Sequence, residues 1–259
     1  MRIATFNING IKARFDGLTD WLVTSAPDVA LLQEIKSQDD TFPREHVEDL
    51  GYAVETHGQK GFNGVAILSR RPLEDVVRGL PGDPNDGQAR WIEATVIDTK
   101  PVRVCCLYLP NGNPAPGEKY DYKLAWMKRL RKRAVALLAA EEPAVMAGDY
   151  NVIPQDEDAA RPDAWREDAL ARPETRTAFR EVLNLGYTDA FRARNQGPGH
   201  YSFWDYQRNA FDRNDGIRID HLLLTPQAAD LMNDCWIEAE VRGRERPSDH
   251  TPVWIELEA

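Results

Sequence analysis

Short apolar runs alternate with longer amphipathic stretches along the chain. Several runs are rich in Val and Ile, which predicts β-strands. The predicted strands are Arg2–Phe6, Val29–Gln33, Val65–Ser69, Trp91–Ile97, Val102–Leu109, Ala144–Ala147, Ile219–Leu224 and Val253–Leu257. Helices are predicted over Gly17–Ser25, Pro43–Asp49, Tyr120–Ala140, Ala164–Leu170 and Glu174–Leu183. This alternation predicts an α/β fold but does not order the strands.

Length and composition indicate one globular unit. The 259 residues contain no linker or repeat that would divide them, so we expect a single domain over residues 1–259. No apolar run is long enough for a membrane span, and the strand-like start at Met1–Asn7 is unlike a signal peptide. Cys105, Cys106 and Cys235 match neither a disulfide framework nor a zinc site. A cytoplasmic location is the natural expectation.

The charge restricts how the chain could bind nucleic acid. Lys and Arg number 32 against 42 Asp and Glu, a formal net charge of −10. This balance argues against a broad DNA-coating surface, because phosphate binding relies on many cations. It still allows a confined basic groove, for which the candidates are Lys12, Arg14, Lys36, Lys60, Arg70, Lys119 and Arg213.

Five apolar runs carry or adjoin polar groups that could bind a metal ion or move a proton. These groups are Asn7 with Asn9, Glu34, Asp149 with Asn151, Asp220, and Asp249 with His250. Any one of them could be an ordinary turn former or helix cap. Asp220 is harder to dismiss, because a carboxylate inside an apolar strand needs a partner. Five such placements together favour a site.

The types of these side chains suggest which metal the site would take. Mg²⁺ prefers oxygen ligands, and Glu34 and Asp249, with Asn7, Asp149 or Asn151 nearby, supply them. Zinc fits poorly, because the set contains no cysteine and a single histidine. The residues therefore predict an oxygen-ligated Mg²⁺ site and leave the substrate open.

Six motifs spread along nearly the whole chain carry a family resemblance. They are Phe6-Asn7-Ile8-Asn9-Gly10, Leu32-Gln33-Glu34-Ile35-Lys36, Tyr108-Leu109-Pro110-Asn111-Gly112, Asp189–Arg192 with Tyr201–Tyr206, Asn214–His221 and Ser248-Asp249-His250. Together they resemble the exonuclease III branch of the AP (apurinic/apyrimidinic) endonucleases, within the endonuclease/exonuclease/phosphatase superfamily. Asn9 stands where some relatives carry an acid. Asn113-Pro114 lacks the arginine with which some eukaryotic relatives retain product.

The resemblance implies a fold and a reaction. The fold would be a two-sheet α/β sandwich with helices on its outer faces. The enzyme would hydrolyse the phosphodiester 5′ to an abasic site, leaving a 3′-OH and a 5′-deoxyribose phosphate. Exonuclease and 3′-phosphatase or phosphodiesterase activity would accompany this. We expect a monomer that acts on double-stranded DNA with abasic sites or damaged 3′ ends, using Mg²⁺ or, in its place, Mn²⁺.

The resemblance also implies roles for the candidate residues. Glu34 would anchor the metal, whose remaining protein contacts would come from Asn7, Asp149, Asn151, Asp249 and His250. Asp149 would move a proton, while Asn151 and His250 would donate hydrogen bonds to phosphate oxygens. Asp220 would orient His250. Tyr108 and Asn111 would contact the phosphate from the opposite wall.

An abasic site needs an apolar slot for a sugar without its base. The candidates are Phe203, Trp204, Ile217 and Ile219, with Arg213 beside them. The alternative is that these are core residues at strand spacing.

Two other functions remain open at this stage. A phosphoinositide phosphatase, sphingomyelinase or non-specific deoxyribonuclease would share the fold and the metal, but Lys36, the Tyr108–Gly112 loop and Phe203-Trp204 favour DNA repair. An inactive binding module would be expected to lack one of the catalytic groups. All of them are present.

Overall fold

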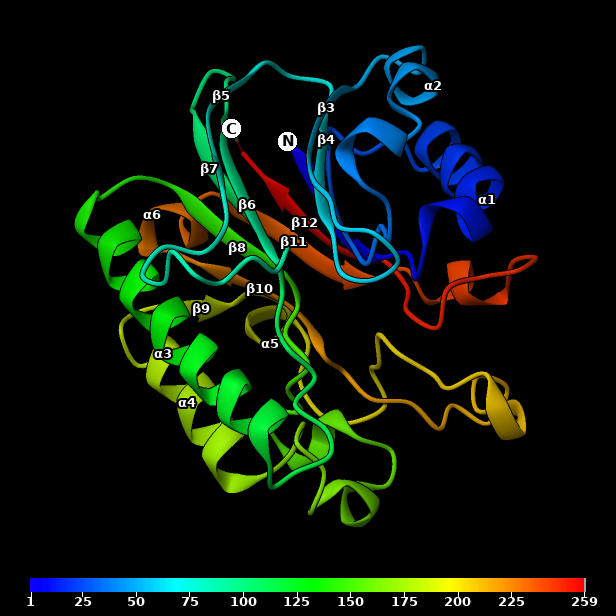
Figure 1. Ribbon diagram of the computed structural model, residues 1–259, viewed down its shortest axis with the longest axis vertical. Coiled ribbons are helices and arrows are strands. Elements are labelled where there is room, and N and C mark those ends of the chain that lie inside the picture. Colours follow the sequence, from blue (N-terminus) through cyan, green and yellow to red (C-terminus); the bar gives the residue numbers. More distant parts are fainter. Residues whose placement is uncertain (259) are drawn as a thin grey trace.

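The computed structural model describes residues 1–258, whose strands form two six-stranded sheets packed face to face (Figure 1). The first sheet has the order β11 (Met232–Ile237), β12 (Val253–Leu257), β1 (Arg2–Asn7), β2 (Val29–Gln33), β4 (Val65–Ser69), β3 (Ala53–His57). The second has the order β5 (Leu73–Arg78), β6 (Trp91–Val96), β7 (Val102–Tyr108), β8 (Ala144–Asp149), β10 (Asp220–Leu224), β9 (Thr188–Asp189).

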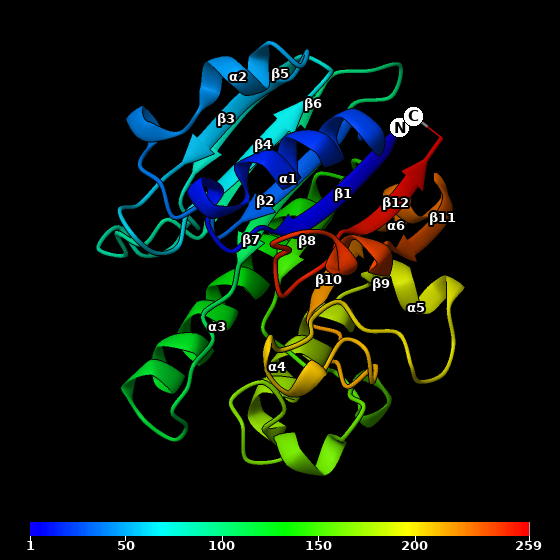
Figure 2. The ribbon, with the colours of Figure 1, turned by 90° about the vertical axis from the view of Figure 1, so that its right-hand side faces the viewer.

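Helices cover the outer faces of both sheets, which makes four layers (Figures 1 and 2). The helices are α1 (Ile11–Thr24), α2 (Arg44–Glu48), α3 (Glu118–Ala139), α4 (Pro173–Leu183), α5 (Ala190–Arg194) and α6 (Pro226–Ala229). One core lies between the sheets, and others lie under α1 and α2 and under α3 and α4. Ile3 and Leu31 point into the central core, while Ala4 and Leu32 point toward α1. Both faces of the inner strands are therefore buried, which explains their continuous apolar runs.

Strand pairing brings the predicted polar groups to one end of the sandwich. β1 and β2 are parallel with Asn7 opposite Gln33, and β7 and β8 are parallel with Tyr108 opposite Asp149. β10 is antiparallel to β8 and begins with Asp220 opposite Asp149. β12 is antiparallel to β1, so the loop before it also reaches this end. Met1 and Leu257 meet at the other end.

All eight predicted strands are present, and the α/β sandwich with outer helices is confirmed. The strands that the pattern did not predict are β3, β5, β9 and β11, which form the four outer edges of the two sheets. An edge strand carries more exposed polar residues, so it lacks the continuous apolar run of an inner strand. In β5, for example, no residue is fully buried.

Two helix predictions need correction. The first helix begins at Ile11 rather than Gly17, directly after a turn at Gly10. No α-helix forms over Ala164–Leu170, where a short 3₁₀ helix over Pro162–Trp165 is followed by turns. There the Asp168 carboxylate accepts a hydrogen bond from the Leu170 backbone N–H, and such local bonds compete with a helix. Within residues 1–258 no helix is long and apolar enough to cross a membrane.

Candidate active site

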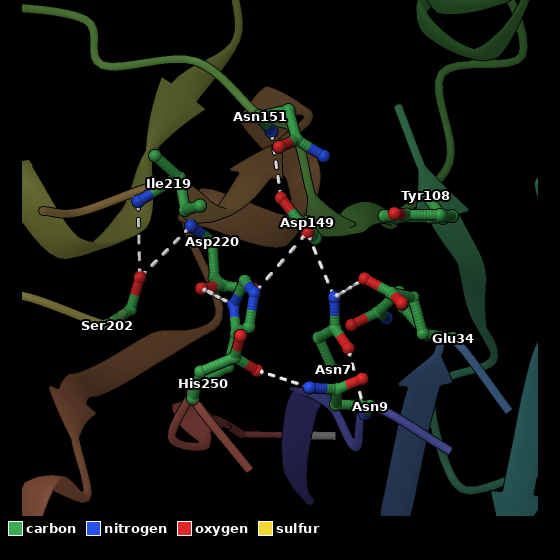
Figure 3. A network of polar contacts seen from close by, with 12 residues as sticks. Asn7, Asn9, Glu34, Tyr108, Asp149, Asn151, Ser202, Ile219, Asp220 and His250 are labelled. Carbon is green, nitrogen blue, oxygen red and sulfur yellow. Dashed lines mark hydrogen bonds and ion pairs between the residues drawn. The ribbon is translucent and has the colours of Figure 1, made fainter. Parts of the chain in front are cut away.

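The polar groups expected from the sequence converge at the end of the sandwich where β1, β2 and β8 finish (Figure 3). Asn7 and Glu34 come from the first sheet, and Tyr108, Asp149 and Asp220 come from the second. His250 enters from the loop before β12. The site therefore spans both sheets.

Asn7 stands at the centre of the site and joins the two sheets. Its fully buried side-chain Nδ2 donates to Glu34 Oε1 at 3.0 Å and to Asp149 Oδ2 at 3.0 Å. Its Oδ1 accepts from the Asn9 backbone N–H at 3.0 Å. Because both Asn7 donors are used by carboxylates, this amide fixes the separation of two acidic groups.

Glu34 is held ionised at the end of β2. Burial alone raises its pKa, but hydrogen bonds from Asn7 and Lys36 outweigh burial and leave the pKa below its usual value. Lys36 Nζ lies 2.8 Å from Glu34 Oε2 and also donates to Asn9 Oδ1 at 2.6 Å. Glu34 and Lys36 both adopt positive φ, 49° and 50°, an unfavourable backbone that is typical of functional sites.

His250 is paired with two carboxylates. Its Nδ1 donates to Asp220 Oδ2 at 2.8 Å, and its Nε2 lies 3.6 Å from Asp149 Oδ2. Burial alone lowers the pKa of His250, but Asp220 and Asp149 raise it to about 10. Both ring nitrogens then carry protons at neutral pH. This favours a charged hydrogen-bond donor over the metal ligand that the sequence also allowed.

Asp149 is fixed by two donors and has a perturbed pKa. Besides Asn7, the Asn151 backbone N–H donates to Asp149 Oδ1 at 2.8 Å. Burial raises the pKa of Asp149 to about 7, with Asp220 and Glu34 adding to the rise and His250 opposing it. A carboxyl that titrates near neutrality suits proton transfer.

The opposite wall comes from the loops after β7 and β8. Asn111 Nδ2 donates to Asn151 Oδ1 at 3.0 Å, and Asn151 Nδ2 donates to the Leu109 carbonyl at 3.0 Å. Asn151 therefore holds Asp149 through its backbone and not through its side chain. Burial, with Glu34 and Asp149 nearby, raises the pKa of Tyr108 well above its usual range. The phenol accordingly stays a proton donor.

Asp249 is tied to the site through Asn9, whose Nδ2 donates to Asp249 Oδ1 at 3.0 Å. Two serines that we did not single out support this region. Ser248 Oγ donates to the Asn7 carbonyl at 2.7 Å, and Ser202 Oγ accepts from the backbone of Asp220 at 3.1 Å. Both serines lie inside the quoted motifs, so their position beside catalytic candidates was the available signal.

Comparison with known proteins identifies the family. The family model described as Endonuclease/Exonuclease/phosphatase family matches residues 4–250. The chain belongs to this family. It is 35% identical to exodeoxyribonuclease III of Haemophilus influenzae, over 99% of this chain and 100% of that protein. The family and this full-length relative establish the coarse activity, that of a metal-dependent nuclease.

Solved structures of family members have the same fold. An AP endonuclease from Archaeoglobus fulgidus superposes with a TM-score of 0.95 at 35% identity, covering 100% of both chains. A 3′ phosphatase from Neisseria, bound to a product DNA hairpin, superposes with a TM-score of 0.94 at 35% identity and the same full coverage. The resemblance inferred from the motifs is thereby confirmed.

The oxygen atoms that could coordinate a metal at this site suit the hard divalent cation of a metal-dependent nuclease. The carboxylates of Glu34 and Asp149 accept hydrogen bonds from Asn7, and that of Asp249 accepts one from Asn9. Oxygen ligands of this kind suit Mg²⁺. The ligand atoms of Asp149, Asp220 and His250 also lie within 4.8 Å of one another. We interpret that second group as an ion-paired triad, because His250 faces a carboxylate with each ring nitrogen.

A cavity of about 160 Å³ lies on the far side of Phe203 from the catalytic groups, none of which lines it. Phe203 and Ile217 line it, and the Phe203 ring packs edge-on to the His250 ring at 5.0 Å. Arg213 also lines this cavity. Two of the residues expected to form a lesion slot, Phe203 and Ile217, therefore line the same cavity.

Two of the residues expected in the slot are buried in the core. Trp204 is 2% exposed, packs on Phe211 at 5.2 Å and donates from Nε1 to Asn214. Ile219 is also 2% exposed and packs in the apolar cluster that contains Ile217 and Ile153. Neither lines the cavity. Both are buried residues of the core.

The expected basic groove is only partly present. Lys12 and Arg14 line a hollow of about 810 Å³ together with Arg244 and Arg246, which the sequence did not suggest. Lys36 is engaged by Glu34. Arg70 lies at the wrong end of the sandwich, because it follows Ser69, which pairs with the first residue of β2. Lys60 and Lys119 remain candidates.

Proposed function

We propose that this protein is a Mg²⁺-dependent DNA repair nuclease that hydrolyses the phosphodiester 5′ to abasic sites. It also acts on 3′ ends, as a 3′–5′ exonuclease and a 3′-phosphatase or phosphodiesterase. One observation carries the proposal: the Phe203 ring contacts His250 of the Asp149–His250–Asp220 triad and, together with Ile217, lines a neighbouring cavity. Phosphate chemistry and a place for a baseless sugar therefore adjoin.

The side chains divide the catalytic work between them. Asp149 accepts or returns the proton of the attacking water, since its carboxylate is fixed by Asn7 and by the Asn151 backbone. The charged His250, with Tyr108 and Asn111, donates hydrogen bonds where the transition state gathers negative charge. Glu34 and Asp249 would hold Mg²⁺, with Asn7 and Asn151 beside them. Bound Mg²⁺ supplies positive charge to the phosphate and the leaving oxygen.

Relatives support both parts of the substrate range. An AP endonuclease and a 3′ phosphatase that was captured with product DNA share this fold along the whole chain. A phosphoinositide or sphingomyelin substrate finds no comparable support. The apolar slot and the motif residue Lys36, which secures Glu34, favour damaged DNA.

The experiment uses duplexes that are labelled at either end and contain a single abasic site. We expect incision on the 5′ side of the site, loss of all activity in EDTA, and recovery with Mg²⁺ or Mn²⁺. A plain duplex, a 3′-phosphorylated nick and inositol phosphates run in parallel. Cleavage of the inositol phosphates, or equal endonucleolytic cutting of the plain and abasic duplexes, would refute the proposal.

We further propose that residues 1–259 form one domain that acts as a monomer in the cytoplasm. The cores under both sheets are continuous with the core between them through the shared strands, and bacterial relatives match the chain end to end. Light scattering with and without abasic DNA tests the monomer. A stable dimer would contradict it.

A further inference from the structure

One buried lysine lies directly behind the catalytic wall. Lys123, on α3, is 0% exposed. Its Nζ donates to the backbone carbonyl of Asn151 at 2.6 Å and to the backbone carbonyl of Asn111 at 3.0 Å. No carboxylate within residues 1–258 forms a salt bridge with it. Two of the three Nζ donors of a lysine ammonium are therefore bonded to peptide carbonyls.

Such a placement costs stability. Burial lowers the pKa of Lys123 to about 7, although the charges of Asp149 and Asp168 act in the opposite direction. Neighbours on the same helix face, such as Trp126, Met127 and Leu130, are apolar, and an apolar residue would avoid the desolvation of an ammonium. Packing of α3 alone does not account for a lysine here.

The two carbonyls belong to the two loops that form the wall. Asn111 follows β7 and Asn151 follows β8, and their side chains are hydrogen-bonded to each other at 3.0 Å. The Asn151 backbone N–H holds Asp149. Lys123 thus links the same two loops that the Asn111 and Asn151 side chains link, but from the opposite side.

The loop after β7 is shaped to admit the lysine. Gly112 has a φ of +90°, and a Cβ at this position would lie 2.7 Å from Lys123 Cδ. The backbone of the loop therefore rests against the lysine stem with no room for a side chain. The Lys123 side chain therefore packs directly against the backbone of Gly112.

We propose that Lys123 is a positioning residue that sets the spacing and orientation of the Asn111 and Asn151 loops for catalysis. It does not touch the substrate, and it acts through the two carbonyls. The inference rests on the proposed function, because the loops are assigned there to the phosphate and to Asp149. It adds α3 to the elements that control the reaction.

A double-mutant cycle tests this inference on abasic duplex with Mg²⁺. We expect Lys123→Met to lower kcat about tenfold to a hundredfold, since small misplacements of catalytic groups have effects of this size, with KM changed less than about threefold. Lys123→Arg, which keeps donors for both carbonyls, should recover most of the loss. Lys128→Met, an exposed lysine on the same helix, is the matched control and should behave like the wild type.

The partner substitution is Asn111→Ala. If Lys123 acts through this loop, the kcat of the double variant should be little lower than that of the less active of the two single variants, Lys123→Met and Asn111→Ala. Additive losses would overturn the inference, and so would a Lys123→Met enzyme with wild-type kcat. Thermal unfolding shows whether each variant is folded.

Lys123→Gln, which keeps one donor, replaces Lys123→Met if the latter does not fold. If neither folds, Lys123 is needed for stability rather than for positioning, and the inference fails. A wild-type protein inactive on every DNA substrate would instead refute the proposed function. The two failures are therefore distinguishable.

Discussion

At the scale of single residues, the site separates groups that hold a cation from a group that moves a proton. Glu34 is kept ionised by Asn7 and Lys36. In contrast, burial and the neighbouring carboxylates raise the pKa of Asp149 to about 7. The two carboxyls share one amide, that of Asn7, yet have opposite pKa shifts. This opposition assigns them different tasks.

The two tasks predict different responses to metal. Glu34→Ala should lower turnover at ordinary Mg²⁺ and recover when Mg²⁺ or Mn²⁺ is raised, because it weakens metal binding. Asp149→Asn should lose about a thousandfold or more in kcat at every metal concentration, because it removes the proton acceptor. Metal titrations of kcat check both, with the exposed Glu45→Ala as a control. Wild-type turnover in Asp149→Asn would remove its assigned role.

Phe203 allows the lesion slot to be tested separately from the chemistry. Phe203→Ala should reduce kcat/KM for abasic-site incision about tenfold or more, because the flipped sugar loses an apolar wall. Removal of a 3′ phosphate, which needs no flipped sugar, should change less than about threefold. Equal losses on both substrates would mean that Phe203 supports His250, which its ring contacts, and not the slot.

The residue scale also shows where sequence reasoning stopped. Motif position was sufficient to single out Glu34, Asp149, Asp220 and His250, because each interrupts, follows or precedes an apolar run. The same reasoning misplaced Trp204, since a tryptophan next to Phe203 gives no sign of which face of the chain is covered. Lys123 shares its helix with other cations such as Lys128, and only the packing of α3 shows that Lys123 is buried.

At the scale of elements, Gly148 of β8 lies against the backbone of Leu107 in β7 just before the site. A Cβ on Gly148 would lie 1.9 Å from the Leu107 carbonyl oxygen. A glycine here lets the strands stay paired up to Tyr108 and Asp149, which stand opposite each other. The strand pairing and the placement of Asp149 therefore depend on one missing side chain.

This contact predicts a large effect for a small substitution. Gly148→Ala should destabilise the protein by about 3 kcal/mol or more, because the strands must separate to admit a methyl group. Urea unfolding measures the change. Gly17→Ala in α1 is the matched control, since nothing lies within 4 Å of its added Cβ and alanine favours a helix. A Gly148→Ala protein as stable as Gly17→Ala would contradict the argument.

Most elements could be predicted, and the failures share a cause. Inner strands such as β2 and β4 have both faces buried, so their boundaries were read correctly. The edge strands β3 and β11 mix exposed polar with buried residues, and their pairing depends on a neighbour distant in sequence. Local pattern carries no information about that neighbour. The order of strands could not be read for the same reason.

At the scale of the whole molecule, a buried ionic network ties the second sheet to its surrounding loops. Arg218 is 1% exposed and binds Asp158 at 2.7 Å and Asp189 at 2.9 Å. It also donates to His221 Nδ1 at 2.9 Å, so His221 Nε2 carries the proton and donates to the Val152 carbonyl. Burial, with Arg218 nearby, lowers the pKa of His221 to about 4.

The network predicts acid sensitivity with a definite sign. The folded pKa of His221 lies below the value of about 6.5 in an unfolded chain, so the unfolded state binds protons more readily. The stability that neutral His221 provides is therefore complete above pH 6.5 and is lost as pH falls toward 4, by about 3 kcal/mol at most. Urea unfolding of wild type and His221→Gln at several pH values should show their difference shrinking over this range. If the stability difference between wild type and His221→Gln did not change with pH, His221 would not be the source of the acid sensitivity.

The division of the site between two sheets has a consequence for how the enzyme fails. Asn7 and Glu34 belong to one sheet and Asp149 to the other, and apolar contacts hold the sheets together. A slight sliding of one sheet past the other would leave every strand intact while separating the carboxylates. Turnover should therefore be lost at a lower temperature or urea concentration than the secondary structure, which far-ultraviolet circular dichroism measures. Catalytic activity would therefore report the relative alignment of the two sheets, and it would fall before any strand unfolds.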